Sequence, residues 1–377
     1  MKHLLTGTAA LMLTAAPVFA GAIERAPQSL GILFEEGNYV EFSAGRVSPD
    51  VSGRDVATFG GNSTGNIAAD YNFIGFGFKQ QFTDNLSAAF IIEQPFGADI
   101  AYPTGPGASV ALGGTAVDVD STTYTALVRY KFDNNFGIHG GVRGSRASGT
   151  VDLRGMAYGG PPGTEGSVNG YSAHLSGAWG TGYVLGASWE KPEIAARVSL
   201  TYNSPIEHDF DTLETLETAV IGAGTTTVKT PRSWTLEGQT GVAADTLVFG
   251  SIRWVNWSEF RVDPTMFVAA TGEGLVDLED TTTYTLGVGR KFTENWSGAL
   301  SFGYEKSGRR LVSPLSPSTG RKSVGLAAIY TQDNLKITTG ITYIKLGDAD
   351  AETGGEARAE FRDNDAWGVG VKVGYSF

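Results

Sequence analysis

Ser172 and His174 are the two residues whose types and spacing come nearest to catalytic chemistry. A histidine beside a serine can act as the general base that activates the hydroxyl as a nucleophile. In the segment Asn169–His174 the two stand two positions apart, which places both side chains on one face of a strand. The sequence shows no partnering acid and no nucleophile motif beside them. A lipase built on a β-barrel is therefore a disfavoured alternative, and we predict that the chain is not an enzyme.

The other residue types exclude several kinds of chemistry. Beyond the first twenty residues the histidines are His139, His174 and His208, and they share no metal-ligand spacing. The chain contains no cysteine, and we predict neither a metal nor a cofactor. Its formal net charge is −12 and it has no basic cluster, so nucleic acid is excluded as a partner.

Three arginines could bind an anionic ligand. Arg129, Arg143 and Arg253 lie on strand faces that the alternation of residue types assigns to the interior. A carboxylate in a dry interior needs a cation, because an unpaired buried charge is costly. The alternative is that each arginine pairs with an inward acid.

An apolar stretch precedes the first predicted strand. Leu30, Leu33 and Phe34 belong to it, and we expect them to fill the interior as a plug and to contact a ligand there. The alternative is a plug that only packs.

A second irregular segment follows the third predicted strand. Pro95 cannot donate a ladder hydrogen bond, and Gly97 weakens pairing further, so the ladder is interrupted around Phe96. Two interpretations stay open, a kinked strand with a gap in its hydrogen bonding and a strand that simply ends.

The elements that would position these residues are β-strands. From Ala366 to Phe377, apolar residues alternate with small or polar ones without a slip, and this period of two defines a strand with one apolar face. An aromatic last residue is typical of the closing strand of bacterial outer-membrane barrels, and we expect the barrel-assembly machinery to recognise it. The same pattern predicts fourteen strands, at 38–50, 67–82, 85–95, 117–132, 135–154, 168–190, 194–211, 228–243, 246–263, 279–292, 296–308, 321–331, 334–348 and 363–377.

Short turns and long connections alternate between these strands. Turns such as 82–85 and 132–135 are tight and polar and follow an aromatic residue, whereas connections such as 51–66 and 349–362 are long. An even strand number with this asymmetry predicts a barrel with its turns in the periplasm and its loops outside. A soluble β-sandwich is the alternative, although it requires neither fourteen strands nor the asymmetry.

We divide the chain into three segments. Residues 1–20 are typical of a secretory signal peptide, residues 21–37 form a short N-terminal hatch, and residues 38–377 form the barrel. No run of 18 apolar residues is present, so only a closed barrel could span a membrane. The predicted fold is all-β, a fourteen-stranded antiparallel transmembrane β-barrel with a short plug. We expect it in the bacterial outer membrane, in contact with the lipid bilayer and lipopolysaccharide.

Several motifs carry a resemblance to a known family. Trp179–Glu190 reads W-G-x-G-x-x-x-G, and the return strand Ala196–Phe210 contains R-x-x-L-T-Y. Thr230–Trp234 and the W-S-x-F of Arg253–Phe260 follow in order. Together they resemble the FadL/TodX outer-membrane transport proteins, which import long-chain fatty acids and other hydrophobic compounds.

The resemblance implies a barrel closed by a small hatch and opened sideways at a break in strand three. The predicted function is passive uptake of hydrophobic molecules, above all long-chain fatty acids, with lateral exit at Pro95, Phe96 and Gly97. Aromatic hydrocarbons are the alternative substrates. The chain departs from the family in its short hatch and in having no Asn-Pro-Ala turn, which argues against gating by movement of a full hatch.

The resemblance also places a substrate groove between the loops after strands five and seven. Met156 and Tyr158 open the first of these loops. Leu213, Leu216 and Val220 stand at i, i+3 and i+7 in the second, a spacing that predicts an apolar stripe on a short helix. The alternative is that the loops pack on themselves.

A diffusion porin for small polar solutes is the rival transport function. Such a porin would have a constriction of opposed charges and no plug. The apolar stretch before strand one argues against it.

Overall fold

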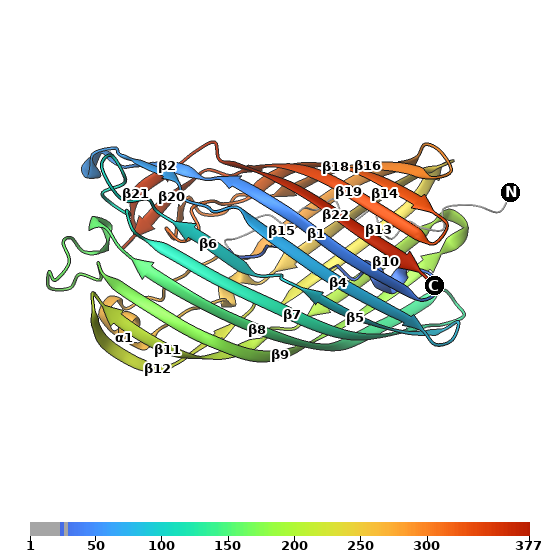
Figure 1. Cartoon of the computed structure of the whole chain (residues 1–377), viewed down its shortest axis with the longest axis horizontal. Helices are drawn as coiled ribbons and strands as arrows, with labels where there is room; N and C mark the ends of the chain where they lie inside the picture. The colour runs from blue at the N-terminus through green and yellow to red at the C-terminus, as the bar shows by residue number, and fades with distance from the viewer. Residues whose placement is uncertain (1–22, 26–28) are drawn as a thin grey trace.

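The period-two alternation of the sequence forms strands that close into a barrel (Figure 1). The computed structural model describes residues 23–25 and 29–377; the predicted signal peptide, 1–20, and part of the predicted hatch lie outside the described residues. Among the described residues, no helix is long and apolar enough to cross a membrane.

The barrel wall has fourteen antiparallel strand positions, as predicted. Three of these positions are each occupied by two shorter strands in line. Their bounds are β1 (Tyr39–Asp50), β4 (Tyr71–Gln81), β5 (Leu86–Glu93) with β6 (Gly97–Ala101), β7 (Ala116–Lys131), β8 (Phe136–Leu153), β9 (Tyr171–Lys191), β10 (Ala196–Asn203) with β11 (Glu207–Leu216), β12 (Ala219–Lys229) with β13 (Ser233–Ala243), β14 (Thr246–Val255), β15 (Thr281–Lys291), β16 (Trp296–Glu305), β18 (Arg321–Gln332), β19 (Leu335–Leu346) and β22 (Asp365–Ser376).

The barrel closes between its first and last strands. β1 pairs with β22 from Tyr39↔Ser376 to Asp50↔Asp365, and its other edge pairs with β4. Closure leaves no free sheet edge, so each long strand has a partner on both sides. The C-terminus lies at the end with the short turns, which we call the turn end; the other is the loop end (Figure 1).

Apolar side chains face outward and polar ones face inward. In β22, Val369 and Val371 are exposed, whereas Lys372 is buried and its ammonium donates a hydrogen bond to Glu41 at 2.9 Å. This is the inverse of a water-soluble sheet, so the sandwich alternative is wrong.

Exposed aromatic side chains form two belts on the outer surface. The belt nearer the loop end contains Tyr124, Trp179, Trp234, Tyr284, Tyr304 and Trp367, and the belt nearer the turn end contains Phe82, Tyr130, Phe132, Phe292, Trp296 and Phe377. Amphipathic and aromatic rings at two levels are typical of a barrel that spans a bilayer.

The long connections at the loop end form a second, five-stranded sheet that we call the cap sheet. It contains β17 (Leu311–Val312), β20 (Ala349–Thr353), β21 (Glu356–Phe361), β2 (Ser52–Asp55) and β3 (Ser63–Asn66). Segments far apart in the sequence thus meet at the loop end of the barrel. Their joint core includes Ala351, Ala359 and Phe361, all fully buried.

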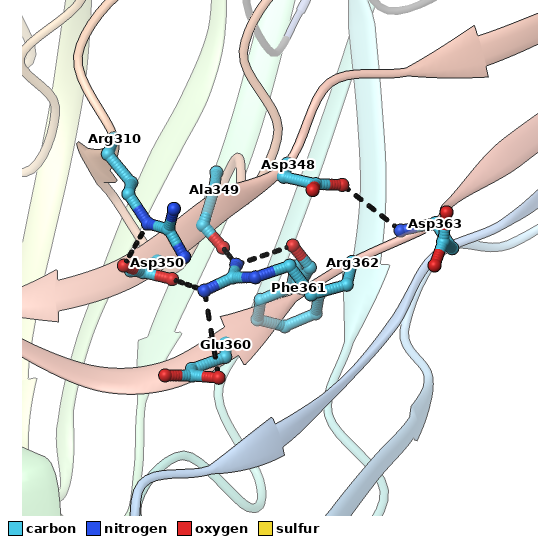
Figure 2. A network of polar contacts seen from close by, with 8 residues as sticks. All are labelled: Arg310, Asp348, Ala349, Asp350, Glu360, Phe361, Arg362 and Asp363. Atoms are coloured by element: carbon cyan, nitrogen blue, oxygen red, sulfur yellow. Dashed lines mark hydrogen bonds and ion pairs between the residues drawn. The ribbon is translucent and has the colours of Figure 1, made fainter.

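Ion pairs tie the cap sheet together (Figure 2). Arg310 donates to the Asp350 carboxylate at 2.7 Å, and Arg362 binds the same carboxylate from the other side. Arg362 also donates to the carbonyl oxygens of Ala349 and Phe361, at 2.6 and 2.7 Å. Burial raises the pKa of Asp350, but the hydrogen bonds from the two arginines outweigh it, so this pKa lies below its usual value.

The helix predicted around residues 211–221 is wrong. β11 and β12 pair as a hairpin from Glu207↔Lys229 to Leu216↔Ala219. Glu217 in the turn between them has φ +58°, a left-handed conformation that ends the strand. Among the described residues, the α-helix is α1 (Thr265–Thr271), which lies in a different loop.

Candidate functional site

A cavity of about 100 Å³ lies inside the barrel toward the loop end, and we call it the apolar chamber. Its main walls are Ile23, Phe96, Val119, Phe210, Phe260 and Leu315. Serine, threonine and His208 supply the few polar groups, and among the described residues none of the lining side chains is Lys, Arg, Asp or Glu. An apolar lining of this kind suits an uncharged ligand better than a charged one.

The chamber was not found from the sequence. Its walls come from inward positions of several strands, such as Val117 and Val119 in β7 and Val151 in β8, together with loop residues such as Phe260. The signal was present as valine and small residues on faces expected to be polar. Alternation assigns a residue to a face, but it does not show which inward residues meet around one cavity.

The predicted break in strand three is present. β5 ends with the pair Glu93↔Thr123 and β6 begins with Gly97↔Asp120, so three residues of strand three oppose two of β7. Such an extra residue is a β-bulge, which bends the strand. The Phe96 N–H donates to Ser121 Oγ at 3.1 Å, and that hydroxyl donates to the Phe96 carbonyl at 2.7 Å.

The other edge of strand three is open at the same level. β4 pairs with β5 as far as Phe76↔Ile92, and the next described backbone bridge is Ala68↔Ile100. Between them, the Ile74 N–H donates to the Gln94 side chain at 3.3 Å. Phe96 lines the apolar chamber, so the break lies in the chamber wall. A transport role for Pro95, Phe96 and Gly97 stays a prediction.

The predicted plug is the short 3-10 helix η2 (Gly31–Phe34). Leu30 and Leu33 are buried against Ala89, Ile91 and Leu127 of the barrel wall. Phe34 lies between two guanidinium groups, with Arg197 4.1 Å and Arg129 4.7 Å from the ring centroid.

Ion pairs fix the residue that follows the plug. The Lys336 ammonium lies 2.8 Å from the Glu35 carboxylate, and Lys79 donates to the Glu35 carbonyl at 2.5 Å. Below the plug, toward the turn end, is a polar cavity of about 920 Å³ that shares no lining residue with the apolar chamber. We call Arg129, Glu190, Arg197 and Lys336 around the plug the plug seat.

The three arginines singled out in the sequence are buried or nearly so, and each lies near an acid. Arg129 pairs with Glu190 and donates to the Leu33 carbonyl. Arg253 pairs with Glu24 and donates to Ser233 at 2.9 Å, and Arg143 lies within electrostatic reach of Glu93. None of the three lines the apolar chamber. Ligand contact by these arginines stays a prediction.

The five loop candidates lie in different environments. Tyr158 is buried in the central core, and Leu216 packs against the same core. Leu213, Val220 and Met156 are exposed, and none of the five lines the chamber. The groove predicted between these loops stays a prediction.

Glu214 is a structural anchor that the sequence did not reveal. Its buried carboxylate accepts hydrogen bonds from the Met266 and Phe267 N–H groups at the start of α1, and from Tyr171 at 2.7 Å. These bonds join the β11–β12 hairpin to α1, which helps to position Phe260 and Leu275 of the same loop near the chamber.

The residues considered for catalysis and metal binding show no reactive arrangement. His174 Nδ1 lies 3.1 Å from the Thr150 hydroxyl, and no acid contact is described for it. In the described part of the chain, no group of three or more His, Asp or Glu side chains could hold a metal ion.

Comparisons with known proteins agree with this architecture. The sequence profile of the family described as "Outer membrane protein transport protein (OMPP1/FadL/TodX)" matches residues 22–377. Comparison with curated protein sequences gives no match.

Solved structures share the fold. A FadL homologue of Pseudomonas aeruginosa superimposes with TM-score 0.71 at 13% identity, covering 92% of each chain. The toluene transporter TodX of Pseudomonas putida gives 0.63 at 13% identity over 98% of this chain and 94% of that one. The toluene transporter TbuX of Ralstonia pickettii gives 0.60 at 14% identity over 96% and 97%. From the match over nearly its whole length, the chain belongs to the OMPP1/FadL/TodX family of outer membrane transport proteins.

Proposed function

We propose that this outer membrane protein takes up hydrophobic molecules from outside the cell and releases them sideways through the break in strand three. The apolar chamber beside that break carries the proposal. Entry of a hydrophobic molecule into such a chamber is favourable, by roughly 25 cal/mol per Å² of apolar surface removed from water. The plug below the chamber supports a lateral route over a route into the periplasm.

The chamber favours a small, uncharged substrate. An apolar cavity of about 150 Å³ accommodates benzene, so a chamber of about 100 Å³ is near the size of one aromatic ring. In the part of the chain that the structure describes, its lining has no cation to pair with a carboxylate. Two solved relatives are described as toluene transporters, which agrees with this size.

Long-chain fatty acids, favoured by the sequence, are the second candidate. The inward arginines are the observation in their favour. Each of these arginines lies near an acid, so a carboxylate would have to displace that acid. The plug packed against the barrel wall beside the polar cavity is an observation against a diffusion porin.

The proposal includes the remaining predictions about the chain. Residues 1–20 are removed as a signal peptide, residues 21–37 act as the hatch, and no step is enzymatic. The barrel contacts lipopolysaccharide, and the assembly machinery recognises the strand that ends at Phe377.

Uptake into cells tests the proposed function. Cells without their own hydrophobic-compound importers would be given labelled toluene, labelled oleate or a labelled sugar, with and without this protein. Faster toluene uptake without sugar entry is the expected result. Oleate uptake alone would move the substrate to fatty acids, and sugar entry alone would overturn the proposal in favour of a porin.

A further inference from the structure

A groove of about 610 Å³ crosses the outer surface of the barrel over β10, β13, β14, β15 and β16, and we call it the outer groove. Exposed apolar and aromatic side chains form its walls, among them Val198, Leu236, Ile252, Leu286, Phe302 and Tyr304. The outer groove extends from the loop-end aromatic belt toward the turn end, so it lies in the band of the barrel that faces lipid. Glu237, Ser251 and Thr285 also border it, but they alternate with outward residues, so their side chains are directed to the interior.

Two glycines form the floor of the outer groove. Gly238 of β13 and Gly250 of β14 stand directly opposite each other. Their missing side chains leave a depression between Val198, which opposes Gly238, and Leu286, which opposes Gly250. Among the described residues, a Cβ built on Gly238 would meet only the Arg197 carbonyl oxygen, at 4.0 Å, so the barrel has room for a side chain there. Glycine inside a strand often marks a place where another molecule approaches the backbone closely.

One row of paired residues leads from the outer groove to the loop end. Followed from strand to strand through the register, the row contains Leu200, Leu236, Ile252, Tyr284, Tyr304, Lys322, Lys345 and Asp365. Because barrel strands are tilted, such a row runs obliquely to the membrane normal. Leu200 lies nearer the turn end of its strand position, whereas Asp365 is the first residue of β22, at the loop end. The row therefore changes from apolar to aromatic and then to charged side chains as it approaches the outside.

Two lysines oppose each other where this row leaves the aromatic belt. Lys322 of β18 is exposed, and Lys345 of β19 is its direct partner in the register. Like charges at opposed positions destabilise a strand pair, so an anion bound between them would relieve the repulsion. Lys345 has an ion pair with Asp363 at 3.3 Å, but that carboxylate is 93% exposed, and exposed pairs contribute little. Nearby Asp365 accepts a hydrogen bond from the Tyr343 hydroxyl at 3.2 Å. A phosphate thus has two cations to bind here and one exposed carboxylate to displace.

We infer that the outer groove and the lysine pair bind one lipopolysaccharide molecule of the outer leaflet. One acyl chain lies over Gly238 and Gly250, and a phosphate of the lipid A headgroup lies between the two lysines. Tyr284 and Tyr304 lie between these contacts, at the level where a headgroup meets its acyl chains. The inference rests on the part of the proposed function that places lipopolysaccharide around the barrel, and it does not depend on which molecule the barrel transports.

Native mass spectrometry of the full chain in detergent tests the phosphate contact. The protein would be titrated with lipid A, with lipid A from which the phosphates have been removed, and with phosphatidylglycerol. Lipid A should bind as one copy per barrel, and removal of its phosphates should weaken binding about tenfold. The double variant Lys322→Gln, Lys345→Gln should lose this preference for phosphate. Arg290→Gln is the matched control and should keep it, because Arg290 is an exposed cation near the turn end of β15.

A filled groove tests the acyl-chain contact separately. Gly238→Leu places a side chain on the floor and should weaken the binding of both forms of lipid A several-fold. Gly144→Leu is the matched control. Gly144 follows exposed Val142 by two positions in β8, away from the outer groove, and a Cβ built on it lies 3.9 Å from the Trp179 ring. Heat-modifiable migration on gels would show that each variant is a folded barrel.

The other outcomes would overturn the inference. Absence of lipid A binding would do so, and so would equal binding by the unmodified protein, the lysine variant and Gly238→Leu. Equally tight binding of phosphatidylglycerol, with the same losses in the variants, would assign the site to a phospholipid instead. A dimer that disappears in Gly238→Leu would assign the outer groove to a second copy of the chain. These measurements do not involve transport, so absence of toluene uptake would overturn the proposed uptake function and leave the lipid site standing.

Discussion

The two ends of the lumen use inward-facing positions in opposite ways. Toward the loop end, no charged side chain stands among the residues described for the walls of the apolar chamber. Toward the turn end the plug seat is dense in charge, with Phe34 between Arg129 and Arg197 and with Glu35 bound to Lys336. Strands of the same barrel contribute to both regions.

The difference separates binding from anchoring. A buried ion pair adds little net stability, but it fixes the two side chains relative to each other. Removal of one partner leaves the other charge buried and unpaired, which is costly. The plug seat therefore holds a short segment in one place. The chamber instead must admit and release a ligand, which apolar walls allow because their contacts are non-directional.

A charge placed in the chamber should have the largest effect. Val119→Asp adds an unpaired carboxylate to the wall, and we expect toluene uptake to fall at least about tenfold. Val119→Asn introduces a side chain of similar size without a charge, so toluene uptake should fall less in this variant. Heat-modifiable migration on gels would show that both barrels are folded. Equal uptake by the two variants would contradict the importance of an uncharged wall.

Reversal of the charge on Glu35, which binds Lys336 of the plug seat, should come next. Glu35→Lys faces Lys336 with a like charge, and breaking such a buried pair costs about 3–5 kcal/mol of local stability. We expect sugar leakage through the released plug, measured by single-channel conductance or sugar influx.

The swap Glu35→Lys with Lys336→Glu is the matched control, because it restores opposite charges. It should close the lumen again. Leakage that persists in the swap would show that the carboxylate of Glu35 has another role.

Removal of the ring between the two arginines should have a smaller effect. Phe34→Leu keeps an apolar side chain but loses two cation–π contacts, worth about 1–2 kcal/mol together. We expect slight sugar leakage and unchanged toluene uptake. A loss of toluene uptake would mean that the plug also forms part of the substrate path.

Protonation of Asp350 in the cap sheet should have the smallest effect, a local loss of stability that is confined to low pH. The pKa of Asp350 lies below its usual value in the folded cap, so its stabilisation is complete above the unfolded pKa of about 3.9 and is lost as the pH falls below it. Hydrogen exchange of β20 and β21 should therefore speed up below about pH 4 relative to the intrinsic rate. Asp350→Asn should remove this pH dependence, and a variant that kept it would assign the titration to another acid.

The strands and the break were predictable because they depend on local chemistry. Alternation from Ala366 to Phe377 defines the closing strand whatever its neighbours are, and Pro95 cannot complete a ladder wherever it stands. The spacing of Leu213, Leu216 and Val220 failed as a helix signal because two short strands and a turn can carry the same residues. Pairing between β11, which contains Leu213 and Leu216, and β12, which contains Val220, outweighed the local pattern.

By itself the sequence determined the class of this protein, an outer-membrane barrel of fourteen strands with a plug, since period, turn chemistry and family motifs all act over a few residues. Only the tertiary structure decided where the function lies. The chamber unites inward residues of separate strands with loop residues, and Glu24 forms a bridge with Phe96 of strand three, about 70 residues away along the chain. Such contacts depend on how the barrel closes, and closure is a property of the whole chain.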